Sequence, residues 1–276
     1  MSSEIRDLQM ALLEILKTVD AICKKHNIQY SLASGTALGA VRHSGFIPWD
    51  DDLDIMFLRS EYDRFLEVAV EELKDTDYVL QREFSEKWPM SYSKIRKNNT
   101  AYIEGYKPKI PDIHQGIFID LFPVDNLLDN RIKTSIQWMC YQLVLANCLN
   151  KRGYTTESKT KRIAMLLSSF VPVKPFVKYV QARSNNNSLK VHSYFGGAVI
   201  RTHNEYPKAL FLEYNEIKFE DDFFQIVKDY DSYLKIAFGD YMELPPEDKR
   251  GEQLHAIKVD LENSYEQYRI GEIEND

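Results

Sequence analysis

Apolar residues recur along the chain with two different periods, and these periods predict both helices and strands. A helical spacing predicts an amphipathic helix at 4–25, a second from 60 to about 74, and a third near 229–238. Ser60 and Asp63 resemble a capping box at the start of the second helix. Stretches rich in aromatic and β-branched residues predict strands at 28–33, 52–58, 78–84, 90–96, 100–104 and 116–122, the last closed by Pro123. Helices and strands in this order predict an α/β (α+β) fold.

A longer helical region follows the last of these strands. Residues 130–183 have a mostly helical pattern, which Gly153 interrupts and which Pro172 and Pro175 interrupt again. The strongly polar C-terminal stretch is expected to be helical or loose. The chain therefore divides into three predicted parts, which are a core at 1–129, a helical basic insertion at 130–190, and a C-terminal part at 191–276 that packs on the core.

Charge is distributed unevenly along the chain. The net charge of −7 argues against a general nucleic-acid binder. Within 151–190, however, nine Lys and Arg residues stand against Glu157 alone, which gives this segment +8 and leaves −15 for the rest. Because apolar residues are interleaved with the bases, we expect the segment to contact the cytoplasmic face of a membrane. Two alternatives remain open: the apolar residues pack on the core while the bases face water, or the bases bind an anionic acceptor.

Composition excludes several classes of protein. Apolar residues make up 44% of the chain and charged residues 28%, as in ordinary globular proteins. No apolar run reaches the roughly 18 residues that a membrane span needs. The start of the chain lacks the features of a signal peptide, so we expect a cytoplasmic protein. Three cysteines without a CxxC pair, Cys23, Cys140 and Cys148, argue against a disulfide framework or a zinc site.

The candidate chemistry lies in an acidic run. Residues 50–54 (DDDLD) hold four carboxylates in five positions. On a strand, Asp52 and Asp54 would point to the same face, where a divalent cation would relieve their repulsion. Asp120 lies in the apolar strand 116–122, where an ionised carboxylate is costly unless it is paired or binds a metal. Three carboxylates on neighbouring strands predict a Mg²⁺ or Mn²⁺ site suited to phosphoryl displacement. The alternatives are a solvated acidic turn and an Asp on the polar face of an edge strand.

A glycine-containing turn precedes the acidic run. Gly35 and Thr36 follow a predicted strand and open a short predicted helix at 37–42, and residues 43–51 are expected to form a loop. Backbone N–H groups at the start of a helix bind phosphate, and Gly35 lets the backbone approach closely. Together the order is strand, Gly-Thr turn, helix, and a strand that carries two aspartates.

This order, and the residues themselves, resemble the LicD family of phosphotransferases in the nucleotidyltransferase fold superfamily. The matching stretches are residues 35–55 (GTALGAVRHSGFIPWDDDLDI), 93–96 (SKIR) with Asn99-Thr100, 116–125 (GIFIDLFPVD), 229–234 (DYDSYL) and 238–246 (FGDYMELPP). Phe238 stands where the family pattern leads us to expect Tyr. The resemblance is thin over 130–190.

The resemblance implies a nucleotidyltransferase-like mixed sheet with flanking helices and a helical insertion. It further implies transfer of phosphocholine, or a similar phospho-alcohol, from a CDP-linked donor to a sugar hydroxyl of a cell-surface glycan precursor, with release of CMP. The acceptor would be a teichoic acid, lipopolysaccharide or capsule precursor, and it would be lipid-linked if the membrane contact holds. The family's metal-binding carboxylates fall on Asp52, Asp54 and Asp120, with Asp50 as an outer ligand, and its phosphate-binding turn falls on Gly35-Thr36. Asp120 would also accept the proton.

Further residues are candidates for substrate binding. For the diphosphate they are Arg42, Lys94 and Arg96, the alternatives being a salt bridge to the acidic run for Arg42 and a solvated strand face for the other two. Weaker candidates are the histidines His43, His114 and His255. A choline cage would need aromatic rings, and the candidates, equally open to a core role, are Trp49, Trp88, Tyr92, Tyr102 and Tyr106. Rival functions are transfer of a nucleoside monophosphate and a non-catalytic scaffold of glycan assembly.

Overall fold

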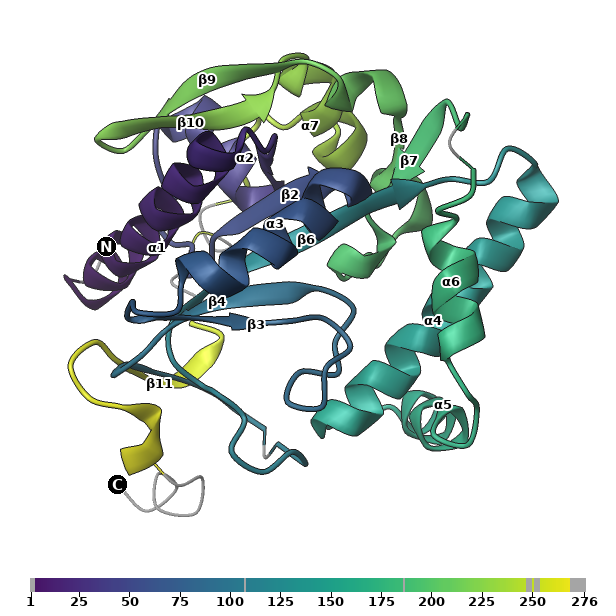
Figure 1. Cartoon of the computed structure of the whole chain (residues 1–276), viewed down its shortest axis with the longest axis horizontal. Helices are drawn as coiled ribbons and strands as arrows, with labels where there is room; N and C mark the ends of the chain where they lie inside the picture. The colour runs from purple at the N-terminus through teal and green to yellow at the C-terminus, as the bar shows by residue number, and fades with distance from the viewer. Residues whose placement is uncertain (1–2, 107, 186, 247–249, 251–253, 269–276) are drawn as a thin grey trace.

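The computed structural model describes residues 3–106, 108–185, 187–246, 250 and 254–268, and its centre is a curved mixed sheet (Figure 1). The strand order is β1-β2-β6-β4-β3, and β7 joins the end of β6 and carries β8. Only β2 and β6 are parallel; the other pairs in this sheet are antiparallel. The strands are β1 (Ser31–Leu32), β2 (Asp54–Leu58), β3 (Tyr78–Gln81), β4 (Ser93–Lys97), β6 (Phe118–Asn126), β7 (Lys190–His192) and β8 (Glu205–Pro207). The predicted α/β (α+β) class is confirmed.

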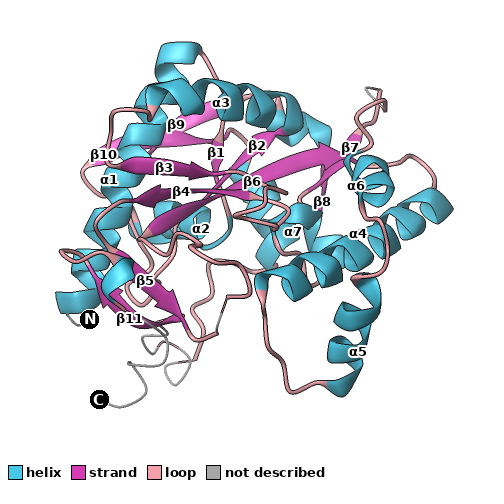
Figure 2. Cartoon of the chain, turned by 60° about the horizontal axis from the view of Figure 1, so that its bottom comes forward, coloured by secondary structure: helices cyan, strands magenta, loops and turns pink. Residues whose placement is uncertain are grey.

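Helices cover this sheet and fix its central strands. The helices α1 (Ser3–His26) and α3 (Arg59–Glu72) pack on each other and on β6, and α3 also contacts β2 (Figures 1 and 2). The apolar stripe of α1 is buried, as its periodicity predicts. The short helix α2 (Ser34–His43) contacts β2 and α7 (Tyr230–Phe238). The predicted helix near 229–238 is thus confirmed as α7.

Two small antiparallel ribbons complete the core. One joins β9 (Tyr214–Phe219) to β10 (Asp222–Val227), at the upper left of Figure 1. The other joins β5 (Ala101–Glu104) to β11 (Ala256–Asp260). The expectation that the polar C-terminal stretch is helical or loose is therefore wrong for β11, because backbone pairing with β5 does not require an apolar strand. Short 3₁₀ turns are η1 (Tyr194–Gly196), η2 (Arg201–Asn204), η3 (Lys208–Phe211) and η5 (Tyr265–Gln267).

The helical region consists of α4 (Arg131–Arg152), α5 (Lys159–Ser168) and α6 (Lys174–Gln181), on the right of Figure 1. Gly153 ends α4 with a φ of 97°, and Pro175 lies in the first turn of α6, so both predicted interruptions are confirmed. Together with η1 and residues near Trp88, α4 and α6 surround a second hydrophobic cluster, distinct from the core under the sheet. The division at 129/130 and 190/191 remains a prediction.

Several predicted boundaries are wrong. The second strand begins at Asp54, so Asp52 lies in the preceding loop and does not share a strand face with it. Strand β6 continues through Pro123, where the sequence pattern predicts its end. Proline is tolerated there because β4 stops pairing opposite Leu121, so no hydrogen bond to β4 is lost. The predicted capping box is also wrong, since α3 begins at Arg59 without a side-chain cap.

A buried ion cluster anchors α3 to the sheet. Arg59 donates from Nε and Nη2 to the two carboxylate oxygens of Asp125, at 2.7 and 2.8 Å, and from Nη1 to Glu83 Oε1 at 2.8 Å. Asp125 is completely buried. The two carboxylates outweigh the cost of burial and hold the pKa of Arg59 above its usual range. A residue at the start of α3 is thereby tied to the end of β6.

Replacing Arg59 should therefore destabilise the fold. Arg59→Met leaves the carboxylates of Asp125 and Glu83 buried without their cation, which should cost about 3–5 kcal/mol of unfolding free energy. Urea denaturation followed by circular dichroism measures this loss. Arg64→Met, on the same helix but with an exposed ion pair to Glu61, should cost about 1 kcal/mol or less. Equal losses in the two variants would contradict the assigned role.

Candidate active site

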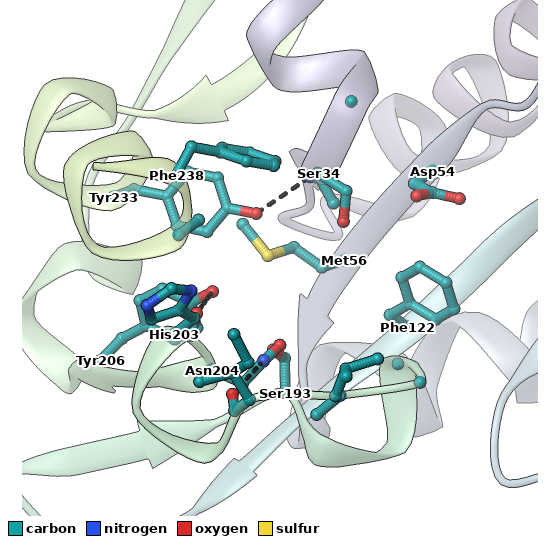
Figure 3. A pocket seen from close by; sticks show the side chains of 18 of the residues that line it. Ser34, Asp54, Met56, Phe122, Ser193, His203, Asn204, Tyr206, Tyr233 and Phe238 are labelled. Atoms are coloured by element: carbon teal, nitrogen blue, oxygen red, sulfur yellow. Dashed lines mark hydrogen bonds between the residues drawn. The ribbon is translucent and has the colours of Figure 1, made fainter. Parts of the chain in front are cut away.

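A cavity of about 380 Å³ opens beside the start of β2 (Figure 3). One side is formed by the first turn of α2 and the acidic run, and the other by residues 193–204 together with α7. Figure 3 shows Phe238, Tyr233 and Tyr206 on one side of the cavity, and Asp54 and Phe122 on the other. The polar residues that line it are Ser34, Asp50, Asp52, Asp54, Ser193, His203 and Asn204.

Backbone pairing fixes two carboxylates beside each other. Asp54, the first residue of β2, lies directly opposite Asp120 in the parallel pair with β6. The Thr36 hydroxyl accepts a hydrogen bond from the N–H of Asp54 at 2.8 Å, and the Ala33 N–H donates to the Asp54 carbonyl at 3.0 Å. Thr36 is buried, so in this structure its hydroxyl positions Asp54 rather than facing the cavity.

Gly35 lies inside the first turn of α2 and not, as predicted, in a turn before it. A Cβ atom at this position would stand 2.8 Å from Asp50 Oδ2. The absence of a side chain therefore lets the Asp50 carboxylate lie against the beginning of the helix. This close approach is a physical reason for glycine here.

The carboxyl groups of Asp50, Asp52, Asp54 and Asp120 lie close together with too few cations nearby to balance their charge. Burial, followed by repulsion from Asp52, raises the pKa of Asp50 to about 8. Burial likewise raises the pKa of Asp52, Asp54 and Asp120, and the first two are raised further by neighbouring carboxylates. A bound cation would reverse these shifts by supplying the missing charge.

Lys94 is the cation nearest to Asp120. Its Nζ lies 2.8 Å from Asp120 Oδ1, which makes an ion pair without hydrogen-bond geometry. This buried oxygen has no other partner in the described part of the chain. Burial lowers the pKa of Lys94 to about 8, against the opposing effect of Asp120. Arg96 is buried too and donates to Gln81 Oε1 and the Gly116 carbonyl, at 2.7 and 2.6 Å. Neither base lines the cavity.

None of the five aromatic residues proposed for a choline cage lines the cavity. Lys94 Nζ lies over Phe118, Trp88 and Tyr92, at 3.1, 5.2 and 5.6 Å from the ring centroids. Arg152 packs over Trp88 and Tyr106 and pairs with Glu104. These rings therefore already hold cations of the chain itself. The Tyr102 hydroxyl is engaged separately, with Asp51.

Asp51 is buried and connects two separate segments through hydrogen bonds, a role that the sequence did not predict. Its Oδ2 accepts hydrogen bonds from the Tyr102 hydroxyl and the His255 N–H, both at 2.7 Å, and its Oδ1 lies 2.7 Å from His255 Nδ1. The middle of the acidic run is thus tied to β5 and to the start of β11. His255 is brought to the acidic group through Asp51, while its own side chain is largely exposed.

The remaining candidates, like these rings, do not line the cavity. Arg42 bonds to His43 Nε2 and to the Tyr241 carbonyl, at 3.1 and 3.2 Å, and no ion pair to the acidic run is found among the described residues. Trp49 stacks edge-on with the exposed His43. His114 accepts from the Gly116 N–H at 3.0 Å and stacks on Tyr265, away from the cavity.

Comparison with known proteins decides the family. The family model described as "LicD/FKTN/FKRP, nucleotidyltransferase domain" matches residues 27–142. A protein of Haemophilus influenzae named lipopolysaccharide cholinephosphotransferase LicD is 30% identical over 259 residues, which cover 88% of this chain and 93% of that protein. This chain belongs to the LicD family. Uncharacterized proteins of Rickettsia typhi and Rickettsia prowazekii are 42% and 46% identical, over only 59 and 52 residues.

The part that matches the LicD family model includes the acidic run, Gly35 and Asp120. The opposite side of the cavity, formed by residues 193–204 and α7, lies beyond it. Sequence reasoning missed His203, Asn204, Tyr206 and Tyr233 as cavity residues. Phe238 could have been singled out from the sequence, because it departs from the pattern expected of the family.

The carboxylates around Asp54 and Asp120 suit a divalent cation in their chemistry, although their side chains are not arranged as a complete coordination site. In the described residues no three His, Cys, Asp or Glu side chains are arranged to hold a metal. Asp54 and Asp120 nevertheless face each other on adjacent strands, Asp120 Oδ1 lacks a hydrogen-bond partner, and the nearby carboxylates are raised in pKa. Oxygen donors under mutual repulsion suit Mg²⁺ or Mn²⁺.

The contact between His255 and Asp51 predicts a measurable pKa. Burial alone would lower the pKa of His255, but Asp51 and then Asp52 and Asp50 raise it above 6.5. The stability this contact adds is therefore present below pH 6.5 and is lost as the pH rises through the folded pKa. NMR titration of the imidazole in metal-free protein should show the raised value, and Asp51→Asn should return it toward 6.5. An unchanged value in that variant would remove Asp51 as the cause.

Proposed function

We propose that this protein transfers phosphocholine, or a similar phospho-alcohol, from a CDP-linked donor to a sugar hydroxyl of a cell-surface glycan precursor, with release of CMP. The proposal rests on the cavity, which has the carboxylates of Asp50, Asp52 and Asp54 on one side and aromatic rings on the other. Its support is the similarity to the Haemophilus influenzae protein named as a lipopolysaccharide cholinephosphotransferase. A lipopolysaccharide precursor is accordingly the acceptor we favour.

The carboxylates would hold Mg²⁺ or Mn²⁺. Asp52, Asp54 and Asp120 are the proposed ligands, with Asp50 as an outer ligand. When bound, the metal neutralises the diphosphate of the donor and stabilises charge as the bond to CMP breaks. Thr36 and the pairing of β2 with β6 hold Asp54 in place for this role. Asp120 would accept the proton of the attacking hydroxyl, with Lys94 beside it.

The start of α2 is the proposed place for the donor phosphates. Ser34 and Gly35 line the cavity at the N-terminal end of this helix. The helix dipole favours an anion there. Because the Asp50 carboxylate already lies against Gly35, the bound metal would have to screen it from the phosphates. Lys94 and Arg96 are buried and already make contacts within the protein. We therefore propose that the end of the helix, and not these two bases, binds the phosphates.

The side of the cavity formed by Tyr206, Tyr233 and Phe238, here called the aromatic wall, is the proposed place for the alcohol. Phe238 lines the cavity and is 45% exposed, so its ring is accessible to a ligand. Aromatic faces attract a quaternary ammonium group such as that of choline. Tyr233 holds the wall against α2, because its hydroxyl accepts a hydrogen bond from the Ser34 N–H at 3.0 Å.

The proposed enzyme acts in the cytoplasm on a lipid-linked acceptor at the membrane. No helix in the described part of the chain is long and apolar enough to span a bilayer. The rival chemistry, transfer of a nucleoside monophosphate, would use the same carboxylates but release pyrophosphate. A non-catalytic scaffold would release neither product and would need no metal to bind a donor.

Removing one carboxylate tests the catalytic assignment. Asp54→Asn and Asp52→Asn should each lower CMP release from CDP-choline about a hundredfold or more, because loss of a ligand weakens metal-dependent charge stabilisation. Chromatography of the nucleotide products measures it. Asp112→Asn is the matched control and should keep full activity, because this aspartate is exposed and does not line the cavity. Activity within a few-fold of wild type in Asp54→Asn would refute the assignment.

Changing the aromatic wall tests the choice of alcohol. Phe238→Ala should raise the KM for CDP-choline by about twofold to thirtyfold, since a cation–π contact contributes about 0.5–2 kcal/mol, while Phe238→Tyr should keep it near wild type. The KM for CDP-glycerol, which has no cation on its alcohol, should change little. Phe223→Ala, an equally exposed change on β10, is the control. An equal effect on both donors would exclude a choline-binding role for Phe238.

A further inference from the structure

The exposed face of α5 is apolar. Ile163, Leu166 and Leu167 are 58%, 59% and 61% exposed, and Phe170, just after the helix, is 80% exposed. Within α5 only Met165 and Ser168 are buried. The alternative that the apolar residues of this region pack on the core is therefore wrong for these four, whereas Val180 does pack inside. We call Ile163, Leu166, Leu167 and Phe170 the α5 ridge.

Bases accompany the α5 ridge. Lys159, Lys161 and Arg162 lie on the same helix, and all three are exposed. No ion pair within the described residues involves any of them. Carboxylates of the described residues thus leave their charge unneutralised, in a segment whose own sequence carries +8. Charge of this kind next to exposed apolar side chains is the pattern of an interfacial helix.

A groove beside α5 brings both features together. It encloses about 810 Å³ between α5 and the residues around the end of α4. Lys109, Lys159 and Arg162 line it together with Ile163 and Leu166. Cations next to apolar side chains match a lipid, whose phosphate lies directly above its acyl chains.

We propose that α5 docks on a membrane surface that contains anionic lipids, with the α5 ridge in the acyl boundary and the bases at the lipid phosphates. In Figures 1 and 2, α5 lies at the periphery of the molecule, where a flat surface can reach it. A second copy of this chain suits the surface less well, because two segments of +8 would repel each other. The docking does not depend on which group the cavity transfers, whereas the lipid-linked acceptor of the proposed function would be reached through it.

Sedimentation with lipid vesicles tests this docking. Full-length protein is mixed with vesicles of phosphatidylcholine alone, or of phosphatidylcholine with phosphatidylglycerol, at low and high salt. We expect binding to the anionic vesicles, weaker at high salt because exposed charges are screened. The combined variant Lys159→Gln, Lys161→Gln, Arg162→Gln should bind on the order of a hundredfold more weakly, since each base near an anionic leaflet contributes about a factor of five.

Apolar variants separate insertion from simple charge attraction. Ile163→Ser, Leu166→Ser and Leu167→Ser together should weaken vesicle binding more than tenfold. The control is Ile132→Ser with Met139→Ser, which changes two similarly exposed residues of α4 and should leave binding unchanged. All these side chains are exposed, so the thermal midpoint should not shift, and CMP release with a water-soluble acceptor should stay at the wild-type level.

Three results would overturn the docking proposal. The first is protein that stays in the supernatant with anionic vesicles at low salt. The second is binding that survives the triple serine change. The third is a concentration-dependent dimer in analytical ultracentrifugation that the serine change abolishes while vesicles remain unbound, since a second copy would then be the occupant. Because vesicle binding needs no turnover, its failure is distinguishable from a failure of the CMP-release assay.

Discussion

Two carboxylates, Asp54 and Asp120, are held opposite each other on neighbouring parallel strands, and most of the site follows from that constraint. Backbone pairing fixes their separation, so they cannot move apart to relieve the repulsion between them. The surroundings respond in several ways: Lys94 pairs with Asp120, the Thr36 hydroxyl anchors the backbone of Asp54, and Gly35 leaves space for Asp50. What remains is a group of buried and half-buried carboxylates with raised pKa values, which is the condition that a divalent cation relieves.

The same acidic run also holds two parts of the fold together. Asp51 points away from the cavity, into hydrogen bonds with Tyr102 and His255, while Asp50, Asp52 and Asp54 line the cavity. Four carboxylates in five positions thus have two different tasks. One position binds the C-terminal ribbon to the core, and the others form the candidate site. The run's sequence alone does not separate these tasks, because the loop conformation before β2 decides where each side chain points.

Local patterns predicted the fold class, the long helices and the strand that carries Asp120. They failed where tertiary contacts decide. Strand β11 is polar and forms because β5 offers a partner; Pro123 lies within β6 because β4 has already ended there. In the site, the order of motifs along the sequence predicted the carboxylates together with Gly35 and Thr36. It did not predict Tyr206, Tyr233 and His203, because these residues lie on separate elements that meet only in the folded chain. Lys94 and Arg96 were expected to face a substrate but are buried, because sequence spacing gives a strand face and not what covers that face.

In the proposed function, this cavity transfers a phospho-alcohol and not a nucleotide. The most direct measurement is ³¹P NMR of the wild-type protein with magnesium, a water-soluble oligosaccharide acceptor, and either CDP-choline or a mixture of nucleoside triphosphates. CDP-choline should yield CMP and a phosphodiester-linked choline on the acceptor, chelation of the metal should stop the reaction, and the triphosphates should release no pyrophosphate. Pyrophosphate release with a nucleotide attached to the acceptor, or choline transfer that persists after chelation, would contradict it.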